Sequence, residues 1–166
     1  YLTETLGARV CLMSHSNGFN VPPAPFELIR GRDYPVIKQL QEVLEKRGIA
    51  KNVFALDGIY DTWETKALVG SFDMLVSGRV HAAVAGLSQN VPTVIIDYGH
   101  EPKAHKLVGF ATVAGAQEYV ADPSNGDDLK NKIELCWNNL AQYKEFLHKK
   151  IPEVKLTAKQ NFSKLK

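Results

Sequence analysis

The sequence has few cysteines, no dominant charge and no long apolar run. Its 166 residues include two cysteines, Cys11 and Cys136, both within apolar patterns. This favours core residues in a reducing compartment over a disulfide framework or a cysteine-bound metal. No stretch approaches the roughly 20 apolar residues that cross a bilayer, and no signal peptide is evident. Because the formal net charge is only +2, we expect no nucleic-acid partner.

Lysines gather near the C-terminal end of the chain, as Lys149, Lys150, Lys155, Lys159, Lys164 and Lys166. Such a run could contact an anionic partner or a membrane surface, although a solvated helix face explains it more simply. We therefore expect a cytoplasmic protein, with a peripheral position at the inner face of the membrane as the alternative. Residues 152–166 are expected to form a polar, helical tail.

The rest of the composition is that of a globular domain, with 45% hydrophobic and 23% charged residues. The first residue is Tyr1, and residues 2–6 resemble the last turn of a helix that ends at Gly7. These two features suggest a fragment of a longer, two-domain protein whose N-terminal domain is missing here. Since no linker or repeat divides the chain, we expect one α/β ligand-binding domain over residues 1–166.

Strand and helix patterns alternate along the chain. Short apolar runs predict strands at 9–14, 52–56, 73–77, 91–97 and 118–121. Helices are expected to begin at Asp33, at Asp61 or Thr62, at Arg79, near Ala104 and at Asp127, the last of them interrupted at Pro152. A proline-rich loop is expected over residues 15–32. The alternation predicts a doubly wound, Rossmann-like parallel sheet with helices on both faces.

Ligands of such sheets bind beyond the carboxyl ends of the strands. The clearest candidate is the junction after the third strand, where Ser77 and Gly78 lead into a helix at Arg79. The first amides of that helix and its dipole suit an anion, and Gly78 permits close approach. Arg79 can bind a carboxylate or phosphate with two hydrogen bonds. His81, two residues on, could transfer a proton or stabilise developing charge. The alternative to a binding site is that Arg79 is an ordinary surface arginine and that His81 packs on the sheet.

Other candidates lie in the neighbouring loops. Tyr98 and Lys103 follow the fourth strand, and lysine suits phosphate as a point charge. His15 follows the first strand, and Arg30 and Arg32 lie in the long loop at the same edge. Taken alone, Lys103 and His15 are also typical surface residues. The chain contains no P-loop, no G-x-G-x-x-G, no nucleophile elbow and no H-E-x-x-H zinc motif.

Residues 71–110 resemble the polysaccharide pyruvyl transferase family. The similarity rests on a block made of Asp73, Gly78, Arg79, Val80, His81 and Ala82, followed by Val91, Pro92, Tyr98 and Lys103. The strand before His15, and Asp33 ahead of a helix, fit the family pattern more loosely. The block covers about a quarter of the chain, and the rest agrees in the order of its elements.

The resemblance implies the C-terminal half of a glycosyltransferase-B-like enzyme. Such an enzyme moves a pyruvyl group from phosphoenolpyruvate to a saccharide acceptor, forming a ketal on a surface or exopolysaccharide, with no metal or organic cofactor. It implies Arg79 and His81 as catalytic residues. It also implies Lys103 as a substrate contact. Together with the loop residues found above, this gives a predicted substrate-binding set of Ser77, Gly78, Arg79, Tyr98, Lys103 and His15. We expect the fragment to fold but to show little transferase activity alone.

Two other functions fit the same architecture. One is a glycosyltransferase or epimerase that uses a nucleotide sugar, although no acidic ribose-binding residue is evident. The other is a binding module that kept the fold and lost the chemistry. The presence of both Arg79 and His81 favours the transferase.

Overall fold

The computed structural model describes residues 1–98 and 106–163. The chain forms two compact units, Tyr1–Trp63 (unit 1) and Glu64–Lys166 (unit 2). Both contain parallel strands joined through helices, which confirms the predicted Rossmann-like α/β fold. The single ligand-binding domain over residues 1–166 stays a prediction.

Unit 1 is built on two parallel strands and one long helix. Strands β1 (Val10–Leu12) and β4 (Val53–Ala55) pair in parallel, with Val10 opposite Val53. Helix α1 (Asp33–Lys46) lies between them in the sequence and packs on β4. Both strands fall inside their predicted ranges, because short β-branched and apolar runs favour buried strands.

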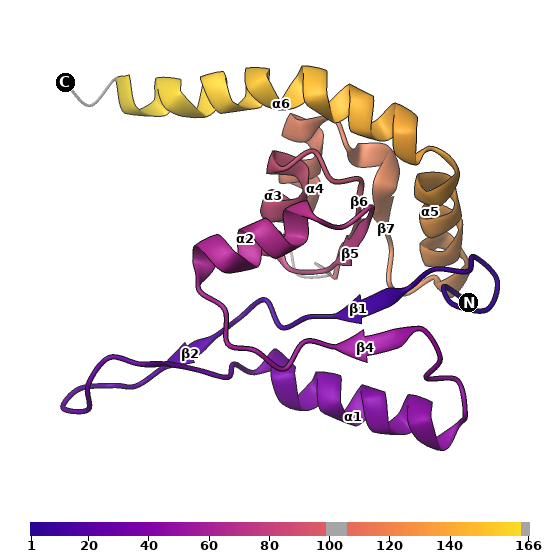
Figure 1. The fold of residues 1–166 in the computed structure, drawn as a ribbon. Coiled ribbons are helices and arrows are strands. Elements are labelled where there is room, and N and C mark those ends of the chain that lie inside the picture. The colour runs from indigo at the N-terminus through magenta and orange to yellow at the C-terminus, as the bar shows by residue number, and fades with distance from the viewer. Residues whose placement is uncertain (99–105, 164–166) are drawn as a thin grey trace. The chain divides into compact units, whose positions relative to one another are not determined.

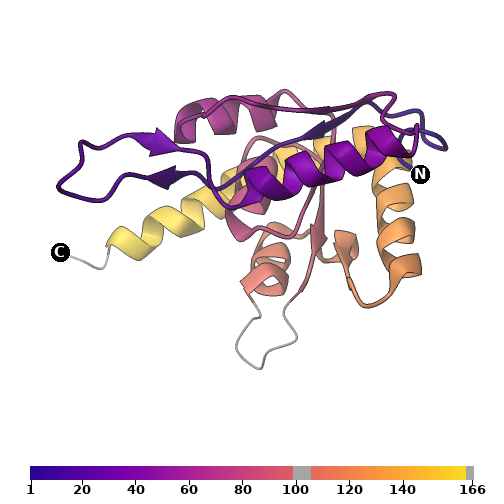
Figure 2. The same ribbon diagram turned by 90° about the horizontal axis from the view of Figure 1, so that it is seen from below.

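The segment predicted as a loop over residues 15–32 contains a small antiparallel ribbon. Strands β2 (Gly18–Phe19) and β3 (Leu28–Ile29) pair with Gly18 opposite Ile29. The ribbon extends away from the β1–β4 pair (Figures 1 and 2). The three prolines lie in the turn between the two strands, where no ladder amide is needed, so they do not prevent pairing at its base.

The ends of α1 match the prediction in part. The helix begins at Asp33, as predicted, but Asp33 is its first helical residue and not its cap, because Arg32 occupies the N-cap position without a side-chain hydrogen bond. Gly48 adopts a left-handed φ of 69°. This allows the Ile49 N–H to donate to the Leu44 carbonyl at 3.0 Å, which closes the helix as expected.

Unit 2 contains a parallel three-stranded sheet with the order β5-β6-β7. Helix α2 (Thr62–Gly70) begins at the end of unit 1 and runs into unit 2. The elements that follow are β5 (Leu75–Ser77), α3 (Val80–Ser88), β6 (Thr93–Ile96), α4 (Lys106–Ala114), a 3-10 turn (Gln117–Tyr119), β7 (Val120–Ala121), α5 (Gly126–Asn138) and α6 (Leu140–Ser163). Helices α3 and α4 lie on one side of this sheet and α5 on the other (Figures 1 and 2). Helices on both faces are what the doubly wound pattern predicted.

The hydrophobic core lies in unit 2. In the described part of the chain, every buried hydrophobic side chain belongs to this unit, and the largest fully buried ones include Leu87, Ile95 and Leu147. Both cysteines are free. Burial raises the pKa of the Cys136 thiol to about 12, as expected for an inert core residue.

The long C-terminal helix breaks at a different place from the one predicted. The break falls at Asn139, between α5 and α6, and α6 continues through Pro152. The Asn139 side chain donates to the Leu135 carbonyl at 2.8 Å, and the Asn139 backbone carbonyl accepts from the Tyr143 N–H at 2.8 Å. This pair of bonds closes one helix and opens the next, whereas Pro152 lies on an exposed position where its missing N–H costs less.

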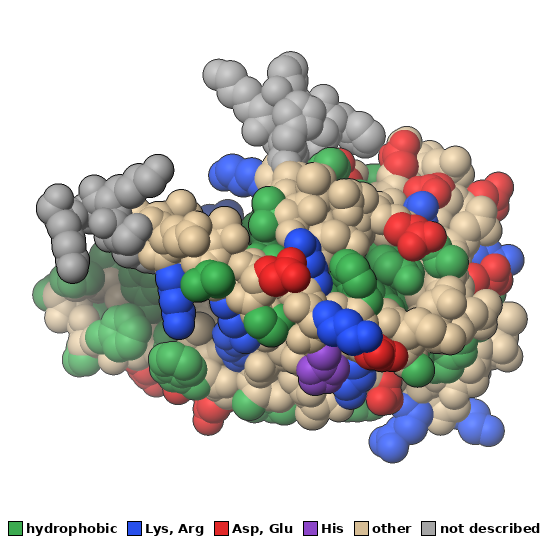
Figure 3. Space-filling model, turned by 90° about the horizontal axis from the view of Figure 1, so that it is seen from above, with side chains coloured by type: hydrophobic (Ala, Val, Ile, Leu, Met, Phe, Trp, Pro, Cys, Tyr) green, Lys and Arg blue, Asp and Glu red, His purple; other side chains and the backbone are tan. Residues whose placement is uncertain are grey.

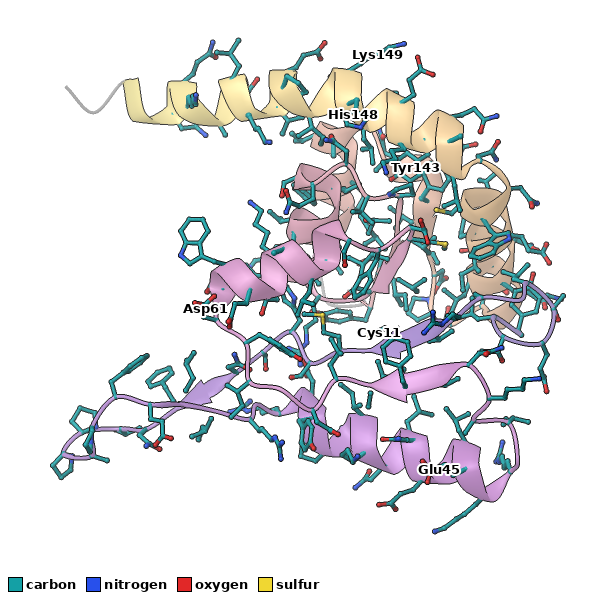
Figure 4. The ribbon with its side chains drawn as sticks, in the orientation of Figure 1. Cys11, Glu45, Asp61, Tyr143, His148 and Lys149 are labelled. Atoms are coloured by element: carbon teal, nitrogen blue, oxygen red, sulfur yellow. The ribbon has the colours of Figure 1, made fainter. Side chains whose placement is uncertain are left out.

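Helix α6 presents opposite faces to the core and to solvent. Tyr143 is buried and turns toward the sheet, while Lys149 lies on the outer side of the helix (Figure 4). Basic, acidic and hydrophobic side chains are interspersed over this outer face (Figure 3). Lys149 pairs with Glu145 at 2.7 Å and Lys150 with Glu153 at 2.9 Å. None of the helices in the described ranges combines the length and apolar character of a membrane span.

Candidate functional site

The parallel register of unit 2 brings three loops to one edge of the sheet. Ser77 at the end of β5 lies opposite Ile95 of β6, and Ile96 lies opposite Ala121 of β7. The segments that follow these strands therefore start side by side, at the edge where ligands of parallel sheets bind. They contribute Ser77, Gly78 and Arg79 after β5, and Tyr98 after β6.

Two hydrogen bonds define the turn from β5 into α3. The Arg79 N–H donates to Ser77 Oγ at 3.1 Å, and the Arg79 carbonyl accepts from the Ala83 N–H at 2.9 Å as the first bond of α3. Arg79 is the N-cap residue, and its side chain makes no capping hydrogen bond. The amides of the first turn, 80–82, have no partners within the helix, so they and the helix dipole favour an anion at this edge.

Gly78 is packed between a ring and a backbone carbonyl. A Cβ placed on Gly78 would lie 3.2 Å from Cδ1 of Tyr98 and 3.3 Å from the Ile96 carbonyl oxygen. Tyr98 itself is 58% exposed. The absence of a side chain at Gly78 therefore lets the turn approach the end of β6, with the Tyr98 ring at its side.

The two candidate catalytic side chains are both exposed at this edge. Arg79 precedes α3, and His81 lies in its first turn. The rest of α3 is largely buried, including Ala82, Ala83 and Leu87. Because α3 is anchored by its buried face, the backbone that carries Arg79 and His81 has a defined position at the sheet edge.

Close packing of α3 on the sheet depends on Gly86. A Cβ there would lie 2.5 Å from Thr93 Oγ1 and 2.9 Å from Leu75 Cδ2. Thr93 is fully buried, and its hydroxyl donates to the Val91 carbonyl at 2.8 Å. Gly86 thus sets the distance between the helix that carries the candidate residues and strands β5 and β6.

The other predicted residues are distributed differently. His15 lies in unit 1, half-buried in the loop after β1. The predicted substrate contact Lys103 lies outside the described residues. The structure therefore brings together Ser77, Gly78, Arg79, His81 and Tyr98 at one sheet edge of unit 2.

Unit 1 has a polar edge of its own, beyond the ends of β1 and β4. The Asn17 side chain donates to the Tyr60 carbonyl, which joins the loops that follow these two strands. Asp57, two residues after β4, accepts a hydrogen bond from the Tyr34 hydroxyl at 2.8 Å and lies 3.6 Å from the Lys38 ammonium. Arg30 donates to the Asp57 carbonyl at 2.7 Å.

This network perturbs the carboxyl group at its centre. The hydrogen bond from Tyr34 lowers the pKa of Asp57, and the charges of Lys38 and Arg30 act in the same direction. Sequence reasoning placed Arg30 at this edge but missed Tyr34 and Lys38. Tyr34 and Lys38 are four residues apart on α1, which puts them on one face of the helix. This spacing was the only feature of the sequence that could have indicated their common contact with Asp57.

Comparison with known proteins identifies the family. A family model described as polysaccharide pyruvyl transferase matches residues 13–100, which is more than half of the 166-residue chain. The chain belongs to the polysaccharide pyruvyl transferase family. No curated protein and no solved structure matches the chain.

The matched segment contains most of the candidate site. His15 and all five residues at the edge of unit 2 lie within residues 13–100, whereas Lys103 lies outside. Membership therefore confirms the resemblance and supports a transferase class for the pyruvyl transferase chain. Among the side chains that the structure describes, no three His, Cys, Asp or Glu residues gather as a metal site.

Proposed function

We propose that the junction of β5 and α3 binds phosphoenolpyruvate and that the chain serves the transfer of its pyruvyl group to a saccharide. The observation that carries this proposal is the first turn of α3, whose amides have no partners within the helix, with Arg79 at its N-cap and Gly78 bringing the turn close to the end of β6. Phosphoenolpyruvate carries two anionic groups. The free amides at a helix N-terminus attract anionic oxygens through the helix dipole. A guanidinium binds the same oxygens with two parallel hydrogen bonds.

The donor would lie across the exposed end of the sheet. One anionic group would face the amides of residues 80–82, and Arg79 would hold the other. Tyr98 would offer its exposed ring to the acceptor saccharide beside this position, because sugar rings pack their apolar faces on aromatic side chains. Lys103 and His15 belong to the same proposal as further contacts to the substrates.

His81 is the proposed general acid. It would give its proton to the methylene carbon of phosphoenolpyruvate, which becomes a methyl group and leaves positive charge on the C2–oxygen unit. A saccharide hydroxyl then adds to C2 and loses its proton, and phosphate departs with the C2–O bond electrons. A second hydroxyl adds to C2 and loses its proton, completing the ketal. Of the two protons released, one restores His81 and the other leaves with phosphate or solvent.

The family supplies the transferase class, and the remaining specifics follow from the donor. Phosphoenolpyruvate is an intracellular metabolite, so we propose a cytoplasmic reaction on a precursor of a surface or exopolysaccharide. No cofactor is needed, because the bond between C2 and phosphate is already activated. Protonation of the methylene carbon, departure of phosphate and addition of two hydroxyl groups account for every bond that changes.

A transfer assay tests the catalytic assignment. Phosphate release and ketal formation are measured with phosphoenolpyruvate and a saccharide acceptor. We expect His81→Ala to lower the turnover rate about 100-fold or more while donor affinity is kept. Arg79→Ala should instead weaken donor binding. Full transfer activity of His81→Ala would exclude His81 as the acid, and His148→Ala, a change at an exposed position of helix α6, serves as the matched control.

A further inference from the structure

Arg30 of unit 1 is held in place at two points. Its guanidinium carbon lies 4.3 Å from the centre of the Tyr34 ring, and one terminal nitrogen donates to the Asp57 carbonyl at 2.7 Å. The ring contact holds the guanidinium beside Tyr34, and the hydrogen bond orients one of its terminal nitrogens. An exposed arginine normally samples many rotamers, so this side chain has already lost much of the entropy that binding would otherwise cost.

No salt bridge joins Arg30 to a carboxylate within the described residues, although its charge helps to lower the pKa of Asp57. The nearby side-chain carboxylate of Asp57 is used by Tyr34 and Lys38, both at Oδ1. Arg30 contacts the backbone carbonyl of Asp57 instead. Lys38 and Asp57 therefore offset one another, and the cluster keeps one net positive charge on a guanidinium whose remaining N–H donors are available.

The surroundings of Arg30 offer polar groups suited to a sugar. Asp57 Oδ2 accepts no hydrogen bond from the described part of the chain, so it can accept one from a hydroxyl group. The hydrogen bond from Asn17 to the Tyr60 carbonyl connects the loop after β1 to the loop after β4 at the same edge. A guanidinium beside an available carboxylate oxygen matches a ligand that carries both an oxyanion and hydroxyl groups.

We propose that unit 1 carries an oxyanion site of its own, in which Arg30 binds the phosphate or carboxylate of an acidic saccharide and Asp57 accepts one of its hydroxyl groups. This inference rests on the proposed function, because a pyruvyl transferase requires a saccharide acceptor. It names the substrate class as acidic sugars and assigns their recognition to Arg30, a residue separate from the donor site at Arg79.

The alternative is that Arg30 has only a structural role and fixes the loop of residues 15–32 to the segment after β4. Arg30→Gln separates the two roles, because the glutamine amide can still donate to the Asp57 carbonyl while the charge and the second donor edge are lost. Arg32→Gln is the matched control, since Arg32 is exposed, lies two residues away and carries the same charge.

The experiment is a titration of the 166-residue chain followed by amide NMR signals of Gly31, Asp57 and Gly58. The protein carries Arg79→Gln in all samples, so that binding at the proposed donor site does not contribute. Glucose 1-phosphate, glucuronate and glucose are added separately. The first two distinguish a phosphate from a carboxylate as the recognised group, and glucose tests whether the charge is needed.

We expect saturable shifts with at least one of the two acidic sugars and none with glucose. Arg30→Gln should weaken that binding about tenfold or more, whereas Arg32→Gln should leave it unchanged. Equal affinity in Arg30→Gln, or no saturation by either acidic sugar, would overturn the proposal. Failure of phosphoenolpyruvate to bind the protein with Arg79 intact would instead count against the proposed function, so the two failures are distinguishable.

Discussion

Gly78 and Tyr98 lie in contact across the ends of two neighbouring strands, and a Cβ on Gly78 would come within 3.2 Å of the tyrosine ring. The same Cβ would lie 3.3 Å from the carbonyl oxygen of Ile96, which is backbone and yields less readily than an exposed ring. This contact limits the size of the side chain that residue 78 can carry beside the first turn of α3. The size of residue 78 is thus linked to the geometry of the proposed donor site.

Gly78→Ala tests that link. We expect weaker phosphoenolpyruvate binding with little change in the free energy of unfolding, because the turn must shift while the core stays intact. Calorimetric titration and denaturant unfolding measure the two quantities. Gly109→Ala in α4 is the control, since a Cβ there meets nothing within 4 Å and alanine favours a helix. Unchanged donor affinity in Gly78→Ala would show that the turn tolerates the shift.

Gly86→Ala should destabilise the fold itself. The added methyl group would meet Thr93 Oγ1 at 2.5 Å and Leu75 Cδ2 at 2.9 Å, in a packed region between α3 and the sheet. Overpacking of this kind costs about 1–3 kcal/mol. Denaturant unfolding gives the free energy of unfolding of Gly86→Ala and of Gly109→Ala, and so compares a closely packed helix glycine with one that has free space around it. Equal stability of the two variants would contradict the packing described for α3.

Leu147→Ala tests how firmly the first half of α6 is docked. Leu147 is fully buried, so its truncation should cost about 2–5 kcal/mol. Leu156, in the same helix, is 61% exposed, and Leu156→Ala should change stability by only about 0.5 kcal/mol. A comparable loss in both variants, measured by denaturant unfolding, would argue that the two halves of α6 are equally packed.

The strands were predictable because each is a short apolar run in an alternating pattern, as in residues 75–77 and 93–96. The junction at Arg79 was predictable too, since a strand that leads through a glycine into a helix creates an anion site by backbone geometry alone. The Asp57 network was not, because it joins residues 23 and 27 positions apart through side-chain contacts. The break at Asn139 was missed because one apolar stripe runs through both helices.

The Asp57 carboxyl group should respond to removal of one hydroxyl group. Tyr34→Phe deletes the hydrogen bond that contributes most to lowering the pKa of Asp57, so that pKa should rise toward its ordinary value. Side-chain carboxyl NMR shifts followed against pH measure it. Glu145, whose pKa is lowered by Lys149, should not change in Tyr34→Phe and should rise in Lys149→Gln.

The sign of the related stability effect follows from linkage. Because the pKa of Asp57 is lower in the folded than in the unfolded chain, the stabilisation is present above the unfolded pKa and is lost as the pH falls through the folded pKa. Tyr34→Phe should therefore flatten the acid side of the stability profile. A steeper loss of stability in acid than in the unmodified protein would contradict this account.

The most direct test of the central claim is calorimetric titration of phosphoenolpyruvate into the 166-residue chain, its Arg79→Ala variant and an Arg47→Ala control at the C-terminal end of α1. The account predicts saturable binding that is lost in Arg79→Ala and retained in Arg47→Ala. Undiminished binding in Arg79→Ala, or saturable binding of a uridine diphosphate sugar in place of phosphoenolpyruvate, would contradict it.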